Sequence, residues 1–105
     1  MMNQIIFNEI QALKRQLIPT EKLILFGSQA RGDAREDSDW DLLVVLNKDG
    51  KRKWEDFDNY AFPFEEIGWD HGVAINALLY TREEWDKGTI FPFYKNVMRE
   101  GIMID

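Results

Sequence analysis

Residues 26–44 read FGSQARGDAREDSDWDLLV, and they join two expected strands through a short polar connection. The apolar run at 23–26 is bounded by Gly27, which is typical of a buried strand. Residues 39–46 end in a second apolar run and predict the next strand. Between them, residues 29–35 predict a short helix, although Gly32 lowers its intrinsic stability. The stretch therefore predicts strand, short helix and strand in that order.

Two aspartates open the second expected strand. Side chains on a strand alternate between its faces, so Asp39 and Asp41 point one way, while Trp40 points the other way and is expected to pack under a helix. The α-carbons of the two aspartates would lie about 6.6 Å apart. Adjacent carboxylates repel each other, and a cation between them relieves the repulsion. A ligand set of oxygens alone favours Mg²⁺ or Mn²⁺ over zinc, whereas the pair by itself leaves a solvated acidic edge open as the alternative.

A glycine and a serine stand where the first strand gives way to the short helix. Gly27 allows a sharp turn, and Ser28 lies where free backbone N–H groups and the positive end of the helix dipole attract phosphate. Arg31 and Arg35 are four residues apart, so they are expected to share a face of the helix and to meet either a phosphate or an acidic neighbour. A phosphate site followed by paired carboxylates predicts metal-assisted phosphoryl transfer.

The rest of the chain alternates between helical and strand patterns. An amphipathic helix is expected over 1–17 and is ended by Pro19. A helix over 51–67 should be kinked or split by Pro63. A strand over 72–80 leads into Thr81 and Glu84, which have the spacing of a capping box. A last helix should have Pro92 in its first turn, and a short strand is expected over 102–104. One sheet with helices packed against it is the predicted architecture.

Length, charge and composition limit the possible classes of function further. The length of 105 residues predicts one domain over 1–105, and the net charge of −6 disfavours general nucleic-acid binding. The chain has no cysteine, which excludes a disulfide framework and a thiolate zinc site. No signal peptide or apolar run of about 20 residues occurs, so no membrane contact is predicted and the cytoplasm is the expected location. One basic cluster is interpreted as a solvated turn and helix start: Lys48, Lys51, Arg52 and Lys53.

The stretch around the aspartates resembles the motif of minimal nucleotidyltransferase domains of the DNA polymerase β superfamily. The strong match covers about residues 23–46, and a weaker likeness runs to the end of the chain. The matching residues are Gly27, Ser28, Arg31, Gly32, Ala34, Arg35, Ser38, Asp39, Asp41, Leu42 and Val44. The resemblance implies an α/β (α+β) nucleotidyltransferase fold with a short, mixed, mainly antiparallel sheet. It also implies helices packed on one face of that sheet and a site on the open face.

The resemblance also implies an activity and its residues. Asp39 and Asp41 would ligate Mg²⁺ or Mn²⁺ and act in catalysis, transferring a nucleoside monophosphate from a triphosphate, ATP in the first instance, to an acceptor hydroxyl. The nucleotide-binding residues would be Gly27, Ser28, Arg31, Arg35 and Ser38. Members of this family with activity commonly add a third carboxylate on the next long strand, where this chain has Asn76. Asp70 and His71 would substitute for it only if the turn before that strand folded back over the site.

Asn76 leaves two functions open. An amide oxygen binds a metal but carries no charge and cannot act as a general base near neutral pH. The chain is therefore either a working, metal-dependent nucleotidyltransferase or a catalytically impaired nucleotide-binding subunit. In the second case it would act as an antitoxin that binds a helical partner protein of the HEPN type. A domain of this size lacks a lobe that would select an acceptor, so a partner protein or a homo-oligomer is expected to supply one.

Overall fold

A sheet of four strands forms the centre of the computed structural model, which describes residues 2–105. The strand order is β3-β2-β1-β4, with β1 antiparallel to both β2 and β4, and β2 parallel to β3. The strands are β1 (Lys22–Phe26), β2 (Trp40–Leu46), β3 (Ile75–Thr81) and β4 (Ile102–Ile104). The predicted fold class, a short mixed sheet with mainly antiparallel pairing, is confirmed.

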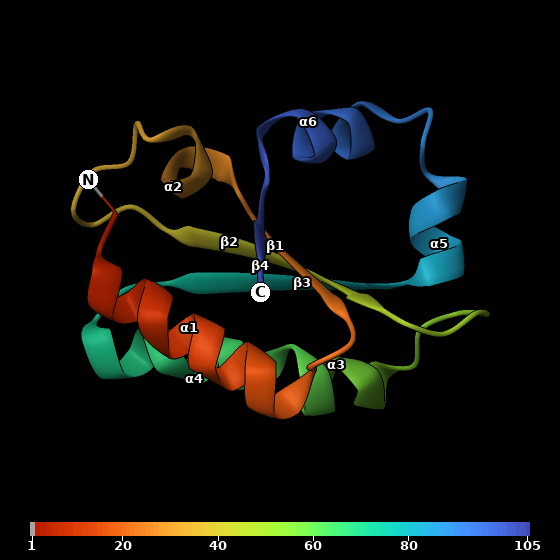
Figure 1. The fold of residues 1–105 in the computed structure, drawn as a ribbon, viewed down its shortest axis with the longest axis horizontal. Coiled ribbons are helices and arrows are strands. Elements are labelled where there is room, and N and C mark those ends of the chain that lie inside the picture. The colour runs from red at the N-terminus through yellow and green to blue at the C-terminus, as the bar shows by residue number, and fades with distance from the viewer. Residues whose placement is uncertain (1) are drawn as a thin grey trace.

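Helices lie on both sides of this sheet. They are α1 (Gln4–Leu17), α2 (Gly27–Arg31), α3 (Trp54–Tyr60), α4 (Phe62–His71), α5 (Arg82–Lys87) and α6 (Pro92–Glu100). Figure 1 shows α1, α3 and α4 together below the sheet, and α2, α5 and α6 above it. Of the first expected helix, Met1 lies outside the described residues. None of the helices described within residues 2–105 has the length and apolarity needed to cross a bilayer.

The larger core lies between the sheet and α1, α3 and α4. Ile6 and Ile10 of α1 and Phe64 of α4 are almost completely buried there against alternate residues of the strands. Trp40 is 1% exposed in the same core, so it packs beneath the helices as predicted. Since Trp40 occupies this face, the flanking aspartates are directed to the opposite one.

The second face of the sheet carries a smaller apolar cluster. Leu43 and Val45 of β2 pack there with Trp85 of α5 and Val97 of α6. The face that was expected to be open is thus partly covered by the two C-terminal helices. Its uncovered part lies where β2 and β3 begin, because α5 follows the far end of β3 directly.

Glycine and proline account for where several helices end. Pro63 splits the helix expected over 51–67, and it stands in the first turn of α4. Gly72 ends α4 in the left-handed conformation with a φ of 68°, so β3 begins at Ile75 and not at Gly72. The capping box is present at α5, where the Thr81 hydroxyl accepts a hydrogen bond from the Glu84 amide and the Glu84 carboxylate accepts one from the Thr81 amide.

Candidate active site

Two carboxylates and one amide meet where β2 and β3 begin. Asp41 of β2 and Asn76 of β3 are paired in the parallel register, and Asp39 precedes β2 by one residue. The Asn76 side-chain amide donates to Asp39 Oδ2 at 3.2 Å and to Asp41 Oδ1 at 3.3 Å. The two aspartates therefore converge on one point, as the alternation of strand side chains predicts, and Asn76 joins them from a neighbouring strand.

Gly27 places the end of β1 against this cluster. Phe26 is paired with Asp41 across the antiparallel register, and Gly27 follows with a φ of +74°. A β-carbon built on Gly27 would lie 2.3 Å from Asp41 Oδ2, closer than any real contact. The position therefore requires glycine for two reasons: its backbone is left-handed, and the Asp41 carboxylate leaves no room for a β-carbon. The glycine–serine bend and the carboxylates share one site.

The short helix α2 begins at this bend. Phe26 is its N-cap residue and gives no side-chain hydrogen bond, so the first amides of α2 have no side-chain cap. Ser28 is half-buried next to them, and its carbonyl accepts from the amides of Gly32 and Asp33. Uncapped N–H groups beside a hydroxyl are the donors that a phosphate accepts.

Arg31 and Arg35 do not share a helix face, and here the prediction was wrong. Gly32 has a φ of +82° and ends α2 at Arg31, so Arg35 lies in the loop that follows. The helix stops because a left-handed residue cannot continue it. The Arg31 guanidinium is held by Asp33 at 3.2 Å and by Glu100 of α6 at 3.4 Å. The hydrogen bond and charge of Asp33, followed by those of Glu100, raise the pKa of Arg31 above its ordinary value.

Ser38 and Gln29 fix the loop that leads into Asp39. The Ser38 hydroxyl accepts from the Arg35 amide at 2.7 Å, and the Ser38 carbonyl accepts from the Gln29 side chain at 3.2 Å. Gln29 is 5% exposed, so this link is shielded from water. Sequence reasoning missed Gln29, because a glutamine in a short helix carries no sign of what it reaches. The roles of Arg31, Arg35 and Ser38 as nucleotide contacts stay predictions.

His71 lies away from the carboxylates. It ends α4, and its Nε2 contacts the Glu9 carboxylate of α1, on the side of the sheet opposite the aspartates (Figure 1). The turn before β3 therefore does not fold back over the site. Among residues 2–105 there is no group of three histidine, cysteine or acidic side chains suited to a metal ion.

The oxygen donors at the site nevertheless fit a hard divalent cation. Asp39 and Asn76 are exposed and Asp41 is half-buried, so the cluster opens to solvent. Rotation of the Asn76 amide would turn its carbonyl oxygen toward the space that its NH₂ group now fills, giving two carboxylates and one neutral oxygen. Such a set, completed by water or phosphate oxygens, is typical of Mg²⁺.

A small cleft adjoins the glycine–serine bend. It has a volume of about 230 Å³ and lies between β1, α2 and α6, with Gly27 and Arg31 on one side and Phe93, Asn96 and Glu100 on the other. The residues from α6 were absent from the predicted site. They are far from Gly27 along the chain, and only the packing of α6 over β1 brings them there.

This chain is similar in sequence or fold to several known proteins. The family model described as "Nucleotidyltransferase domain" matches residues 8–104. A candidate protein adenylyltransferase of Methanocaldococcus jannaschii is 38% identical over 81 residues, which are 77% of this chain and 74% of that protein. The crystal structure of a toxin–antitoxin with AMP-PNP shares the fold at a TM-score of 0.63. That likeness covers 94% of this chain and 72% of the other, at 18% identity.

Proposed function

This chain belongs to the nucleotidyltransferase domain family, and from that membership we propose that it transfers a nucleoside monophosphate, from ATP in the first instance, to an acceptor hydroxyl. The observation that supports the proposal most is the convergence of Asp39, Asp41 and Asn76 beside Gly27. In the reaction, the acceptor oxygen forms a bond to the α-phosphorus and the bond to pyrophosphate breaks. The acceptor's proton leaves to water.

Each part of the site has a task in this proposal. The uncapped amides at Gly27 and Ser28 bind the terminal phosphates, with the Ser28 hydroxyl as a further donor. Asp39 and Asp41 would hold a divalent cation, Mg²⁺ or Mn²⁺, which would supply positive charge to offset that of the triphosphate. Glu100 and Asp33 orient Arg31 at the rim of the cleft, where its guanidinium meets a phosphate or ribose oxygen.

Asn76 sets a limit on the chemistry. Its amide cannot remove a proton from the acceptor near neutral pH, so the chain has no side chain for that task at this position. We expect slow transfer, with positioning and cation binding intact. The chemical step should then speed up as the pH rises, because solvent hydroxide takes the proton more readily.

The acceptor in this proposal is a protein. The relative from Methanocaldococcus jannaschii is named as a candidate protein adenylyltransferase, and the structural neighbour comes from a toxin–antitoxin. A second candidate function follows from Asn76 together with that neighbour: a nucleotide-binding antitoxin subunit that acts by binding a HEPN-type helical partner, with little or no transfer. A homo-oligomer is the remaining candidate partner.

Nucleotide binding tests the proposal first. Calorimetric titration of the protein with ATP, with and without Mg²⁺, should show binding that depends on the cation. The double variant Asp39→Asn, Asp41→Asn keeps the size of both side chains and should lose that dependence. Equal ATP binding by the variant and the wild-type chain, or ATP binding that does not depend on Mg²⁺, would rule out a cation held by these carboxylates.

Transfer separates the two candidate functions. The chain is incubated with α-labelled ATP, GTP, CTP or UTP, with Mg²⁺ or Mn²⁺, and with the protein encoded beside it. Label on that protein supports the enzyme. If label appears only with Asn76→Asp, the native chain is an impaired enzyme. A stable complex that accepts no label from either chain points to the antitoxin function.

A further inference from the structure

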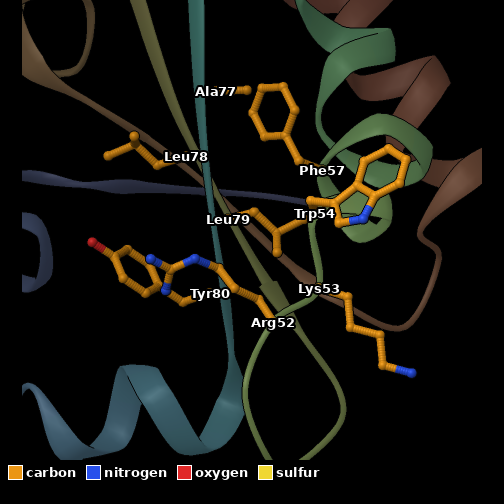
Figure 2. Close-up of a pocket in the computed structure, with 8 residues that line it drawn as sticks. All are labelled: Arg52, Lys53, Trp54, Phe57, Ala77, Leu78, Leu79 and Tyr80. Carbon is orange, nitrogen blue, oxygen red and sulfur yellow. The ribbon is translucent and has the colours of Figure 1, made fainter.

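A groove crosses the exposed edge of β3 close to the candidate active site. It has a volume of about 400 Å³ and is lined by β3 residues 77–80, by two residues of α3 and by two residues of the loop before α3. Figure 2 shows Trp54 and Phe57 on one side of β3, and Leu78 and Tyr80 on the other. We call this feature the β3 groove.

The β3 groove exposes two large apolar side chains close together. Trp54 is 80% exposed and Leu78 is 41% exposed, and both line it. Large aromatic side chains on a surface are typical of the centre of a binding interface. Because Trp54 stands in the first turn of α3 and makes little contact with the core, packing of the fold does not explain it.

The rim of the β3 groove is basic in a chain whose net charge is −6. Lys51, Arg52 and Lys53 precede α3, and Arg52 and Lys53 line the groove. Within residues 2–105, neither Lys51 nor Lys53 has an ion-pair partner, whereas Arg52 pairs with Glu84 at 3.1 Å and lies 4.9 Å from the centre of the Tyr80 ring. Two unpaired lysines beside exposed apolar side chains favour an occupant that is acidic and partly apolar.

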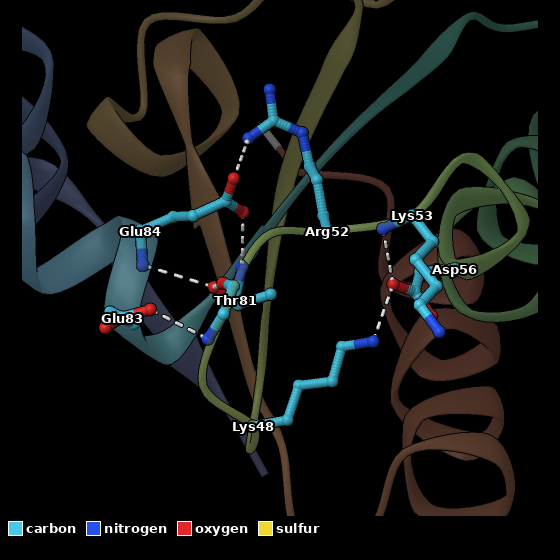
Figure 3. Close-up of polar contacts among 8 residues, drawn as sticks. Lys48, Arg52, Lys53, Asp56, Thr81, Glu83 and Glu84 are labelled. Carbon is cyan, nitrogen blue, oxygen red and sulfur yellow. Dashed lines mark hydrogen bonds and ion pairs between the residues drawn. The ribbon is translucent and has the colours of Figure 1, made fainter.

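The basic rim is held in place by hydrogen bonds to β3 and α5. Figure 3 shows the network around Thr81, whose hydroxyl donates to the Gly50 carbonyl at 2.6 Å, while the Gly50 amide donates to Glu83 at 2.8 Å. Asp56 accepts from the Lys53 amide and from the Lys48 ammonium, each at 2.8 Å. A loop fixed at both ends presents its lysines without a large ordering cost, which favours a binding surface.

The edge of β3 is not free to extend the sheet with a second copy of this chain. The Ala77 amide donates to Glu65 of α4 and the Thr81 amide donates to Glu84, each at 3.0 Å. Strand amides alternate in direction, so the Leu79 amide between them is the outward one that remains. A single outward amide cannot support a continuous sheet between two copies of the chain. A ligand at this edge must therefore be recognised by side chains.

The β3 groove leads to the carboxylates. Asn76 and Leu78 are two residues apart on one face of β3, so the part of the groove on that face begins about 6.6 Å from Asn76 along the strand. Building on the function proposed above, we propose that the β3 groove binds an extended, acidic segment of the acceptor protein and places its hydroxyl near Asp39 and Asp41. The groove would thereby contribute to the selection of the acceptor.

Labelled peptides test this proposal directly. One twelve-residue fluorescent peptide alternates valine and glutamate around a central threonine, and its matched peptide has lysine in place of glutamate. Fluorescence anisotropy should show that the wild-type chain prefers the acidic peptide by about tenfold or more. A single-stranded RNA of twelve nucleotides is the competing probe. RNA binding through the groove, or equal binding of both peptides, would overturn the proposal.

Variants locate the binding surface. Lys53→Glu should weaken binding of the acidic peptide about tenfold, and Trp54→Ala should do the same because it removes the aromatic contact. The matched controls are Lys95→Glu on α6 and Trp69→Ala on α4, the latter 67% exposed, and both should bind as the wild type does. Thermal melts check that each variant is folded. Equal affinities in groove and control variants would place the peptide elsewhere and refute the assignment.

The same variants distinguish a failure of the groove proposal from a failure of the proposed function. Binding of Mg²⁺–ATP is measured on every variant and should be unchanged in Lys53→Glu and Trp54→Ala. If nucleotide binding is intact while the peptide preference is absent, the groove proposal fails alone. If the wild-type chain binds no nucleotide, the proposed function fails, and any preference for the acidic peptide then no longer concerns an acceptor.

Discussion

Replacing Gly27 by alanine tests the contact that joins the glycine–serine bend to the carboxylates. Alanine must adopt a φ of +74° there, and its β-carbon would lie 2.3 Å from Asp41 Oδ2. The left-handed backbone alone costs roughly 1–2 kcal/mol for a residue with a β-carbon. The Asp41 side chain must also leave its position, and a rotation off its rotamer adds about 1 kcal/mol.

Gly32→Ala is the matched control for this change. Gly32 has a φ of +82°, and a β-carbon built there meets no atom of residues 2–105 within 4 Å. It therefore carries the backbone cost without the clash. We expect Gly32→Ala to lose roughly 1–2 kcal/mol of unfolding free energy and Gly27→Ala to lose about 1 kcal/mol more. In a domain of this size each kilocalorie lowers Tm by roughly 4–8 °C.

Urea denaturation measures the stability of both variants, and calorimetry measures their affinity for Mg²⁺–ATP. Gly27→Ala should bind the nucleotide at least about tenfold more weakly, since a displaced carboxylate costs more than the 1.4 kcal/mol that a factor of ten represents. Gly32→Ala should bind it nearly as well as the wild type does. If the two variants lose equal stability and equal affinity, the contact between Gly27 and Asp41 has no role in the site.

Two further substitutions test the polar contacts. Asn76→Asp removes two hydrogen bonds and adds a third carboxylate, so without metal it should lose about 1–2 kcal/mol of stability. Mg²⁺ should restore that stability by binding the folded state. Asn76→Ala keeps only the carboxylates of Asp39 and Asp41, so it should show a smaller Mg²⁺ response, and an equal response in both variants would contradict the reasoning. The Lys48 ammonium and the Lys53 amide lower the pKa of Asp56. The ionised Asp56 therefore stabilises the fold fully above its ordinary pKa, near pH 4. That stabilisation is lost as the pH falls through the lowered pKa. Asp56→Asn should therefore cost about 1 kcal/mol at pH 7 and much less at pH 2, measured by urea denaturation; a cost that is the same at both pH values would count against the ion pair.

Local patterns were enough to predict most of the elements. Pro63 and Pro92, the Thr81–Glu84 capping box and the apolar runs at β1 and β2 each act within a few residues, so their effect can be read directly. The prediction failed for the helix at 29–35, because a left-handed Gly32 ends α2 after Arg31. Propensity alone indicates that Gly32 weakens a helix, but it does not say that the chain turns there.

The convergence of Asp39 and Asp41 was already present in the sequence, because alternate residues of any strand face the same way. Everything that makes them a site comes from contacts between distant segments. The parallel register of β2 and β3 brings Asn76 to both carboxylates, and the antiparallel register of β1 and β2 sets Gly27 against Asp41. The packing of α6 adds Asn96 and Glu100, and the loop before α3 adds the basic rim of the β3 groove. Strand periodicity is a local property of the chain, so the sequence alone determines it. Strand register and helix placement depend on which apolar surfaces are buried together. Only the folded structure shows which surfaces those are.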